Sequence, residues 1–181
     1  AHHASSAERL PILPEFYAAI MDAVGPVGSV LDLACGLNPL ATPWMGLAPG
    51  TRYIACDMYA DLIAYLGAAL PLLGVDGEAR LCDLAQPEAL PAADVALILK
   101  TVPCLEQTDK AAGARLLAAA PAPVLVVTFP THSLGRRDKG MPASYERRFW
   151  ELASGQPLAG GQPWRVETLR FETELAFVVR R

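Results

Sequence analysis

The sequence lacks the residue patterns that would hold a metal ion or a disulfide framework. Its four cysteines, Cys35, Cys56, Cys82 and Cys104, lie far apart and form no Cys-x-x-Cys pair, so the usual zinc spacing is absent. All four fall at or near the ends of expected strands, which is typical of small buried hydrophobic residues in a reducing compartment. We therefore expect a cytoplasmic protein with no metal site.

Long apolar runs and a secretory leader are also missing. The longest apolar candidates, around 95–99 and 124–129, have the length of strands and are too short to cross a bilayer. No basic start followed by an apolar core and a small-residue cleavage site is found. With 181 residues, 52% of them hydrophobic, the sequence predicts one folded domain over 1–181. We expect a monomer with no membrane partner.

An excess of basic residues is missing as well. The formal net charge is −4 and the pI is about 5.3, which argues against a surface that attracts RNA over its whole area. A local basic patch stays open. One cluster could bind phosphates or could equally be a solvated loop: Arg136, Arg137, Lys139, Arg147 and Arg148.

What is present is an alternation of apolar, β-branched runs with helical stretches. Strands are expected at 29–34, 53–56, 79–82, 95–100, 124–129, 165–171 and 174–180, and helices at 13–24, 59–73 and 107–119. Helix-length crossovers predict a parallel sheet covered on both faces, whereas the last two strands, with only Glu172-Thr173 between them, predict an antiparallel hairpin at the sheet edge. Residues 130–142 and 154–163 are expected to be loops. The order resembles that of an α/β, Rossmann-like class I methyltransferase with a mostly parallel seven-stranded sheet and a C-terminal antiparallel hairpin.

Polar groups follow the expected strands at the edge where such folds bind ligands. Gly36 follows the first strand, Asp57 ends the second about 20 residues later, Asp83-Leu84 end the third and Lys100 ends the fourth. Each has a plainer interpretation, because a lone glycine is often a turn and Asp57 or Asp83 could cap a helix or short turn. Together, and in this order, they favour a nucleoside cofactor. The missing Gly-x-Gly-x-x-Gly argues against NAD, whereas S-adenosylmethionine carries no phosphate.

Several longer segments resemble one family, the aminoglycoside-resistance 16S ribosomal RNA methyltransferases that modify guanine N7 in the decoding site. They are "HASSAERLPILPEFY" (3–17), "LDLACGLNPL" (31–40), "LILKTVPCLEQ" (97–107), "FPTHSLGRRDKGM" (129–141), "YERRF" (145–149) and "ETELAFVV" (172–179). Two departures are visible. The N-terminal helical domain usual in the family, which docks on the ribosomal subunit, is expected to be absent, and Arg136-Arg137-Asp138 replace glycines that commonly follow the SLG segment.

The resemblance implies an S-adenosylmethionine-dependent enzyme whose partner is 16S rRNA within the 30S subunit. It implies that Arg9 binds the methionine carboxylate of the cofactor and that the basic cluster binds RNA. It places Lys100 near the methyl group, for positioning only. The other cofactor residues that it implies are Ala34 and Gly36 at the amino-acid end, Asp57 at the ribose with Met58 beside it, Asp83 and Leu84 at the adenine, and Gln107 at the rim.

Methylation of guanine N7 makes modest chemical demands. N7 carries an in-plane lone pair and no proton. The enzyme therefore has chiefly to align N7 with the methyl carbon and the sulfur of the cofactor, and no general base is needed. A paired guanine must be extruded to reach the cofactor. No Asn/Asp-Pro-Pro-aromatic motif of amine methylation is present. Three alternatives stay open: a cytosine-C5 enzyme with Cys104 as covalent nucleophile, a methyltransferase for a small molecule or another RNA position, and a cofactor-binding relative without rRNA activity.

Overall fold

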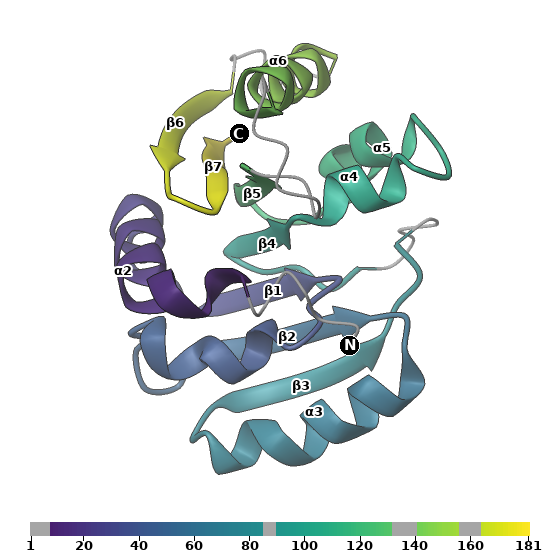
Figure 1. The fold of residues 1–181 in the computed structure, drawn as a ribbon. Helices are drawn as coiled ribbons and strands as arrows, with labels where there is room; N and C mark the ends of the chain where they lie inside the picture. The colour runs from purple at the N-terminus through teal and green to yellow at the C-terminus, as the bar shows by residue number, and fades with distance from the viewer. Residues whose placement is uncertain (1–7, 85–89, 132–140, 156–163) are drawn as a thin grey trace.

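A single mixed sheet organises the chain in the computed structural model, which describes residues 8–84, 90–131, 141–155 and 164–181 (Figure 1). Seven strands lie in the order β3-β2-β1-β4-β5-β7-β6. Their bounds are β1 Ser29–Leu33, β2 Arg52–Asp57, β3 Asp76–Leu81, β4 Val95–Leu99, β5 Val124–Pro130, β6 Arg165–Arg170 and β7 Glu174–Arg180. Strands β1 to β5 pair in parallel, and β7 pairs antiparallel with both β5 and β6. The predicted Rossmann-like fold with a C-terminal antiparallel hairpin is confirmed.

The helices differ from the sequence prediction in several places. Their bounds are η1 Leu10–Ile12, α2 Leu13–Val24, η2 Asn38–Trp44, α3 Ala60–Leu72, α4 Thr101–Leu105, α5 Ala112–Ala119 and α6 Met141–Ser154. The 3-10 helix η2 was not expected, and its internal Pro43, which has no N–H to donate, suits these tight turns. The helix expected at 107–119 begins only at Ala112, as α5, and the short helix α4 before it was not expected. Residues 141–142, expected in a loop, begin α6.

Gly113 explains why the two short helices α4 and α5 pack so closely. A Cβ atom at this position would lie 2.8 Å from Glu106 Oε1 and 2.9 Å from Val102 Cγ1, closer than atoms normally approach. Asp109 turns the chain between the helices by accepting a 2.9 Å hydrogen bond from the N–H of Ala111. This tertiary fit has no periodic signature in the sequence.

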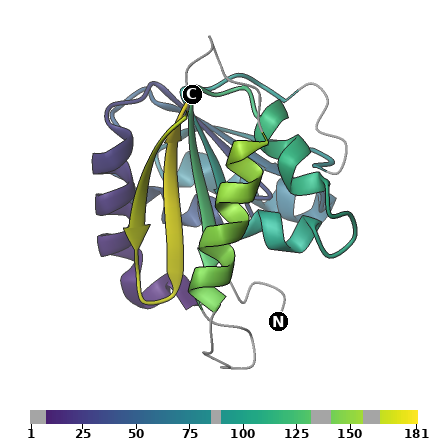
Figure 2. The same cartoon turned by 90° about the horizontal axis from the view of Figure 1, so that it is seen from above.

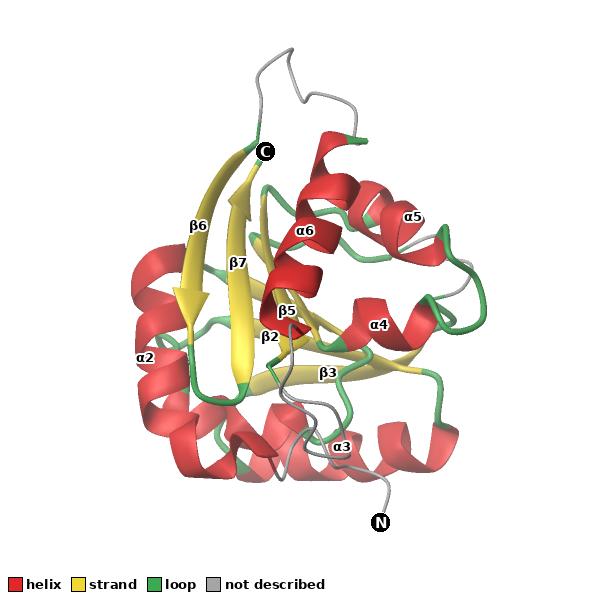
Figure 3. Cartoon of the chain, turned by 45° about the horizontal axis from the view of Figure 1, so that its top comes forward, coloured by secondary structure: helices red, strands yellow, loops and turns green. Residues whose placement is uncertain are grey.

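The sheet carries a hydrophobic core on each face. One core packs α2, η2 and α3 against alternate strand residues such as Val30 and Val126. The other packs α4, α5 and α6 against the intervening residues such as Leu31 and Val127. Figures 2 and 3 show α2 and α6 on opposite sides of the β6–β7 hairpin. Within the described residues, no helix has the length and apolarity needed to cross a membrane.

The two ends of the parallel strands carry different chemistry. At the amino end, Arg180 donates to the carbonyl oxygens of Ala23 and Val24, where α2 ends. Arg181 donates to carbonyl oxygens just beyond and within α5, those of Leu117, Ala120 and Ala122. A cation near the C-terminus of a helix satisfies carbonyl groups that the helix leaves without a partner. The carboxyl end holds the candidate site.

Candidate active site

Two residues with side chains adopt the left-handed backbone conformation at the carboxyl ends of β1 and β4. Ala34 has φ 52° and Lys100 has φ 56°. The two strands are neighbours across the point where the sheet order reverses, which is where open α/β sheets bind ligands. Such a conformation costs about 1 kcal/mol or more for a residue other than glycine and clusters at functional sites. Strain is therefore concentrated where a ligand is expected.

Lys100 is held in place from both its backbone and its side chain. Its N–H donates to the carbonyl oxygen of Thr128 at 3.1 Å and to the Thr128 hydroxyl at 3.0 Å. Its Nζ lies 2.8 Å from Glu8 Oε2 and 3.5 Å from Glu174 Oε1, and the residue is 7% exposed. Two carboxylates and one strand thus fix the ammonium group, which suits the positioning role that the sequence predicted.

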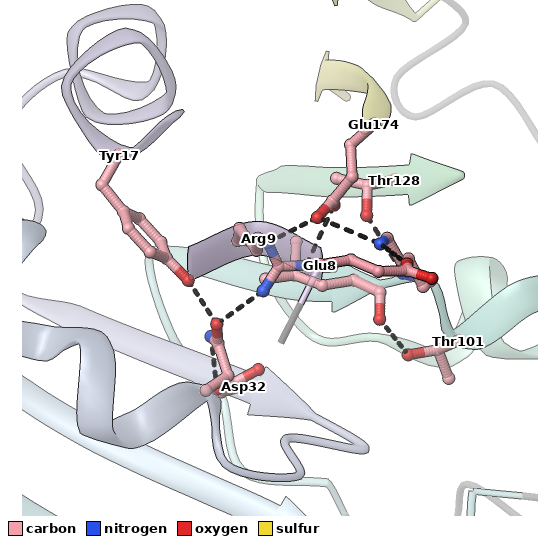
Figure 4. Close-up of polar contacts among 10 residues, drawn as sticks. Glu8, Arg9, Tyr17, Asp32, Thr101, Thr128 and Glu174 are labelled. Atoms are coloured by element: carbon pink, nitrogen blue, oxygen red, sulfur yellow. Dashed lines mark hydrogen bonds and ion pairs between the residues drawn. The ribbon is translucent and has the colours of Figure 1, made fainter. Parts of the chain in front are cut away.

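Arg9 forms the centre of a buried polar cluster (Figure 4). Its Nε donates to Glu174 Oε1 at 2.6 Å and its NH2 to Glu174 Oε2 at 2.9 Å, while its NH1 donates to Asn38 Oδ1 at 2.9 Å. The guanidinium also lies 4.8 Å from the ring centre of Phe16. Arg9 is 4% exposed and Glu174 is fully buried. Sequence reasoning named Arg9 but missed Glu174, whose signal was an acidic residue opening an apolar strand.

Asp32 extends this cluster into the sheet. Its Oδ2 accepts hydrogen bonds from the Tyr53 hydroxyl at 2.6 Å and from Asn38 Nδ2 at 2.9 Å, and Asn38 Oδ1 accepts a third bond from the Tyr17 hydroxyl. Burial raises the pKa of Asp32 to about 6, although both hydrogen bonds and the nearby Arg9 charge act to lower it. Asp32 and Asn38 were also missed, although a carboxylate inside an otherwise apolar strand was visible in the sequence.

Asp57 ties the glycine turn after β1 to the end of β2. Its Oδ2 accepts the N–H of Gly36 at 2.9 Å, and its Oδ1 accepts the N–H groups of Met58 at 2.7 Å and Tyr59 at 3.4 Å. The plainer interpretation of Asp57 as the N-cap of the following helix does not apply, because that position is Tyr59. A carboxylate offers about four lone-pair positions, so Oδ2 keeps room for a further donor such as a hydroxyl.

The remaining predicted cofactor residues lie around this edge with different exposure. Leu84 is buried and Asp83 is exposed. The N–H of Cys82 donates to the carbonyl oxygen of Asp57 at 2.8 Å, and this bond holds the end of the third strand beside the end of the second. Met58 is 64% exposed. Gln107 is exposed just beyond α4, where its N–H donates to Cys104 O at 3.3 Å. Within the described ranges, no hydrogen bond joins its side chain to the Arg9 cluster.

The described part of the basic cluster separates into two kinds of residue. Arg147 is exposed on α6. Arg148 instead forms a bidentate contact with Glu106, at 2.6 and 3.1 Å, and also donates to Lys110 O at 3.2 Å and to Glu151 at 3.1 Å. Arg148 therefore joins α6 to the α4–α5 region. Three members of the predicted cluster lie outside the described residues: Arg136, Arg137 and Lys139.

Cys104 has surroundings that do not favour a covalent mechanism. Its thiol lies in α4 and donates to Lys100 O at 3.5 Å. Partial burial raises its pKa, so the thiolate needed for nucleophilic attack is disfavoured. Among the described residues, no group of His, Cys, Asp and Glu is arranged to hold a metal ion.

Comparisons with known proteins agree with this architecture. The family model described as ribosomal RNA methyltransferase (FmrO) matches residues 1–178. A 16S rRNA (guanine(1405)-N(7))-methyltransferase of Micromonospora rosea is 42% identical over 99% of this chain and 63% of its own length. One of the same name from Frankia casuarinae is 44% identical over 99% of this chain and 61% of its own length. The chain thus spans less than two thirds of these relatives.

Two solved structures of 16S rRNA methyltransferases are also similar to this chain over nearly its whole length. The 16S rRNA methyltransferase RmtF, crystallised with S-adenosyl-L-homocysteine, superposes with a TM-score of 0.83 at 34% identity, covering 99% of this chain and 65% of that one. The 16S rRNA methylase ArmA superposes with a TM-score of 0.78 at 26% identity, covering 99% of this chain and 87% of that one. With its sheet order, its polar carboxyl edge and a match over nearly its whole length, the chain belongs to the ribosomal RNA methyltransferase (FmrO) family.

Proposed function

We propose that this chain is the S-adenosylmethionine-dependent catalytic domain of an enzyme that methylates guanine N7 in 16S rRNA and so confers aminoglycoside resistance. The observation that carries the proposal is the meeting of Arg9, Asp57 and Lys100 at one edge of the sheet, beside the strained ends of β1 and β4. Relatives named for this reaction, at 42% and 44% identity, support it.

The residues of this edge fit the chemical groups of S-adenosylmethionine. Arg9 has N–H groups for a carboxylate, and Asp57 has a free lone-pair position for a ribose hydroxyl. Ala34 and Gly36, with φ 52° at both, shape the turn for the amino-acid end. In the proposed site, Leu84 packs against the adenine, Asp83 accepts from its amino group, and Met58 and Gln107 lie at the rim. The cofactor would supply an electrophilic methyl group on a positively charged sulfur.

The protein's own part in the reaction is mainly orientation. Because N7 has a lone pair and no proton, no residue has to remove a hydrogen before methyl transfer. Lys100, held by Thr128, Glu8 and Glu174, positions the reacting groups without acting as a base. The same buried ion pairs keep the edge rigid, and rigid placement is the main source of rate in a reaction of this kind.

The proposed partner is 16S rRNA within the cytoplasmic 30S subunit, bound by a monomer. Arg147 has the exposure needed to contact phosphates, and we assign the same role to Arg136, Arg137 and Lys139. Arg148 keeps its predicted RNA role only in part, because Glu106 and Glu151 already neutralise its charge. The target guanine must leave its base stack to reach Lys100.

The test is to locate the methyl group. The full chain is incubated with 30S subunits, or with naked 16S rRNA, and S-adenosylmethionine labelled on the methyl group. N7-methylguanine is then mapped by borohydride reduction, aniline cleavage and primer extension. Cleavage at one guanine, lost in the Lys100→Ala variant, supports the proposal. Label on cytosine C5 that disappears in Cys104→Ser would replace it with the covalent alternative, and label on no RNA would refute it.

A further inference from the structure

Glu174 lies between two buried cations, Arg9 and Lys100, that are far from it and from each other in the sequence. Its Oε1 is 2.6 Å from Arg9 Nε and 3.5 Å from Lys100 Nζ, and its Oε2 is 2.9 Å from Arg9 NH2. The side chain is fully buried. Figure 4 shows the carboxylate facing Arg9. Whatever moves Glu174 therefore moves both the expected cofactor-binding arginine and the expected positioning lysine.

The position of Glu174 indicates that it stays in place when a ligand binds. It is the first residue of β7, where it pairs with Pro130 of β5, and its carbonyl oxygen accepts the N–H of Phe171 at 2.8 Å. A carboxylate that left Arg9 and Lys100 would leave buried charges without partners, and that is strongly unfavourable. A cofactor carboxylate therefore has to join Arg9 without displacing Glu174.

The hydrogen-bond inventory of Arg9 leaves room for this. A guanidinium has five N–H groups in a fixed plane. Among the described residues, Glu174 takes one from Nε and one from NH2, and Asn38 takes one from NH1. One N–H on each terminal nitrogen remains. These two hydrogens lie in the guanidinium plane and can be donated to a second carboxylate.

We propose that Glu174 is a positioning residue that fixes the plane of Arg9, so that its two remaining N–H groups bind the carboxylate of S-adenosylmethionine. The same carboxylate holds Lys100 in register with that end of the cofactor. This inference rests on the proposed function. The alternative is that Glu174 takes the N–H groups of Arg9 that the cofactor needs and has to be displaced before the cofactor binds; we call this alternative a latch.

The test compares two ligands that differ at the methionine end. S-adenosylhomocysteine carries the carboxylate, and 5′-methylthioadenosine lacks the whole amino-acid end. Calorimetry on the full chain measures both affinities for wild type and for Glu174→Gln. We expect Glu174→Gln to weaken S-adenosylhomocysteine about tenfold or more, the loss typical of a misplaced charged hydrogen bond, and to change methylthioadenosine less than about twofold. The matched control is Glu146→Gln, which breaks a Glu–Arg contact with the exposed Arg170 and should change neither affinity.

Other outcomes overturn the inference in distinct ways. A rise in S-adenosylhomocysteine affinity in Glu174→Gln would show a latch. An equal loss for both ligands would show a general scaffold role. If Arg9→Gln lowers the preference for the carboxylate-bearing ligand but Glu174→Gln does not, the positioning role fails and the cofactor assignment stands. If Arg9→Gln leaves that preference unchanged, both fail.

A second variant covers the case in which Glu174→Gln does not fold. The double variant Arg9→Gln, Glu174→Gln removes both charges of the buried pair together and leaves Lys100 paired with Glu8. Because Glu174 acts on the ligand carboxylate through Arg9, the double variant should show the same ligand preference as Arg9→Gln alone. A further loss of preference in the double variant contradicts the inference.

Discussion

The turns at the two ends of the parallel strands use different residues at their positions with positive φ. At the amino end the positions with positive φ are glycines, including Gly25 after α2, Gly50 before β2 and Gly74 before β3. At the carboxyl end, beside Gly36, two such positions are Ala34 and Lys100. A glycine there would remove the strain. At Lys100 the strained position instead carries a side chain that pairs with Glu8 and Glu174, and such strain is typical of functional sites.

The charged residues differ in the same way. At the amino end, Arg180 and Arg181 bind backbone carbonyl groups and need no partner charge. At the carboxyl end, the buried cations Arg9 and Lys100 both pair with the buried carboxylate of Glu174. The first arrangement stabilises helix ends. The second keeps charges out of water at some cost, which is typical of a site that uses them. Four predictions test this contrast, in order of expected effect.

Removing the central carboxylate should have the largest effect on stability. Glu174→Ala leaves Arg9 and Lys100 buried with fewer counter-charges, and we expect the free energy of unfolding to fall by about 3–5 kcal/mol. Urea denaturation measures it. The comparison is Glu146→Ala, which breaks the exposed contact with Arg170 and should cost less than about 1 kcal/mol. Similar losses in the two variants would mean that burial of the cluster has no special role.

Asp32 should make stability depend on pH. Its pKa in the folded protein is about 6, above the ordinary value of 3.8, so the folded state holds the proton more tightly than the unfolded chain does. The contribution is complete below pH 4 and is lost as pH rises through 6, by up to about 3 kcal/mol at 1.36 kcal/mol per pKa unit. Asp32→Asn, which keeps an oxygen for Tyr53 and Asn38, should remove this dependence. The free energy of unfolding of both proteins is measured at several pH values from 4 to 7.5. The same dependence on pH in the two proteins would contradict the prediction.

Arg181 should matter for stability and not for ligand binding. It donates to the carbonyl oxygens of Leu117, Ala120 and Ala122, and burial lowers its pKa. We expect Arg181→Ala to lower the free energy of unfolding by about 2 kcal/mol, the usual loss for charged hydrogen bonds. Affinity for S-adenosylhomocysteine, measured by calorimetry, should stay unchanged. A loss of affinity would show that the two ends of the sheet are coupled.

Exchanging alanine and glycine between the two ends should give small effects of opposite sign. Gly25 has φ 82° and ψ −175°, a region open essentially only to glycine, so Gly25→Ala should destabilise the protein by about 1 kcal/mol or more. Ala34→Gly should stabilise it by about 1 kcal/mol by relieving a left-handed alanine. Thermal unfolding measures both. Destabilisation by Ala34→Gly would mean that its backbone is not strained.

The sequence predicted the features that repeat locally, and it missed those that depend on distant partners. Apolar runs located all seven strands, and the rule that ligands lie beyond strand ends drew attention to Gly36, Asp57 and Lys100. The close packing of α4 against α5 depends on the fit of Gly113 against Glu106, which no periodicity reveals. Glu174, Asn38 and Asp32 were overlooked because their importance comes from contacts across the sheet. The cofactor and RNA roles of the named residues stay predictions.

The pairing of Arg9 with Glu174 also constrains how the protein is made. The two residues are 165 positions apart, and β7, which begins at Glu174, must insert between β5 and β6. During synthesis Arg9 therefore emerges long before its partner exists, and the ion pair cannot form until β7 has been translated. Folds that rely on such distant pairings fold slowly, because the loop must close before the contact gives any stability. A nascent chain halted before residue 174 should carry most of the sheet but an unassembled Arg9 cluster.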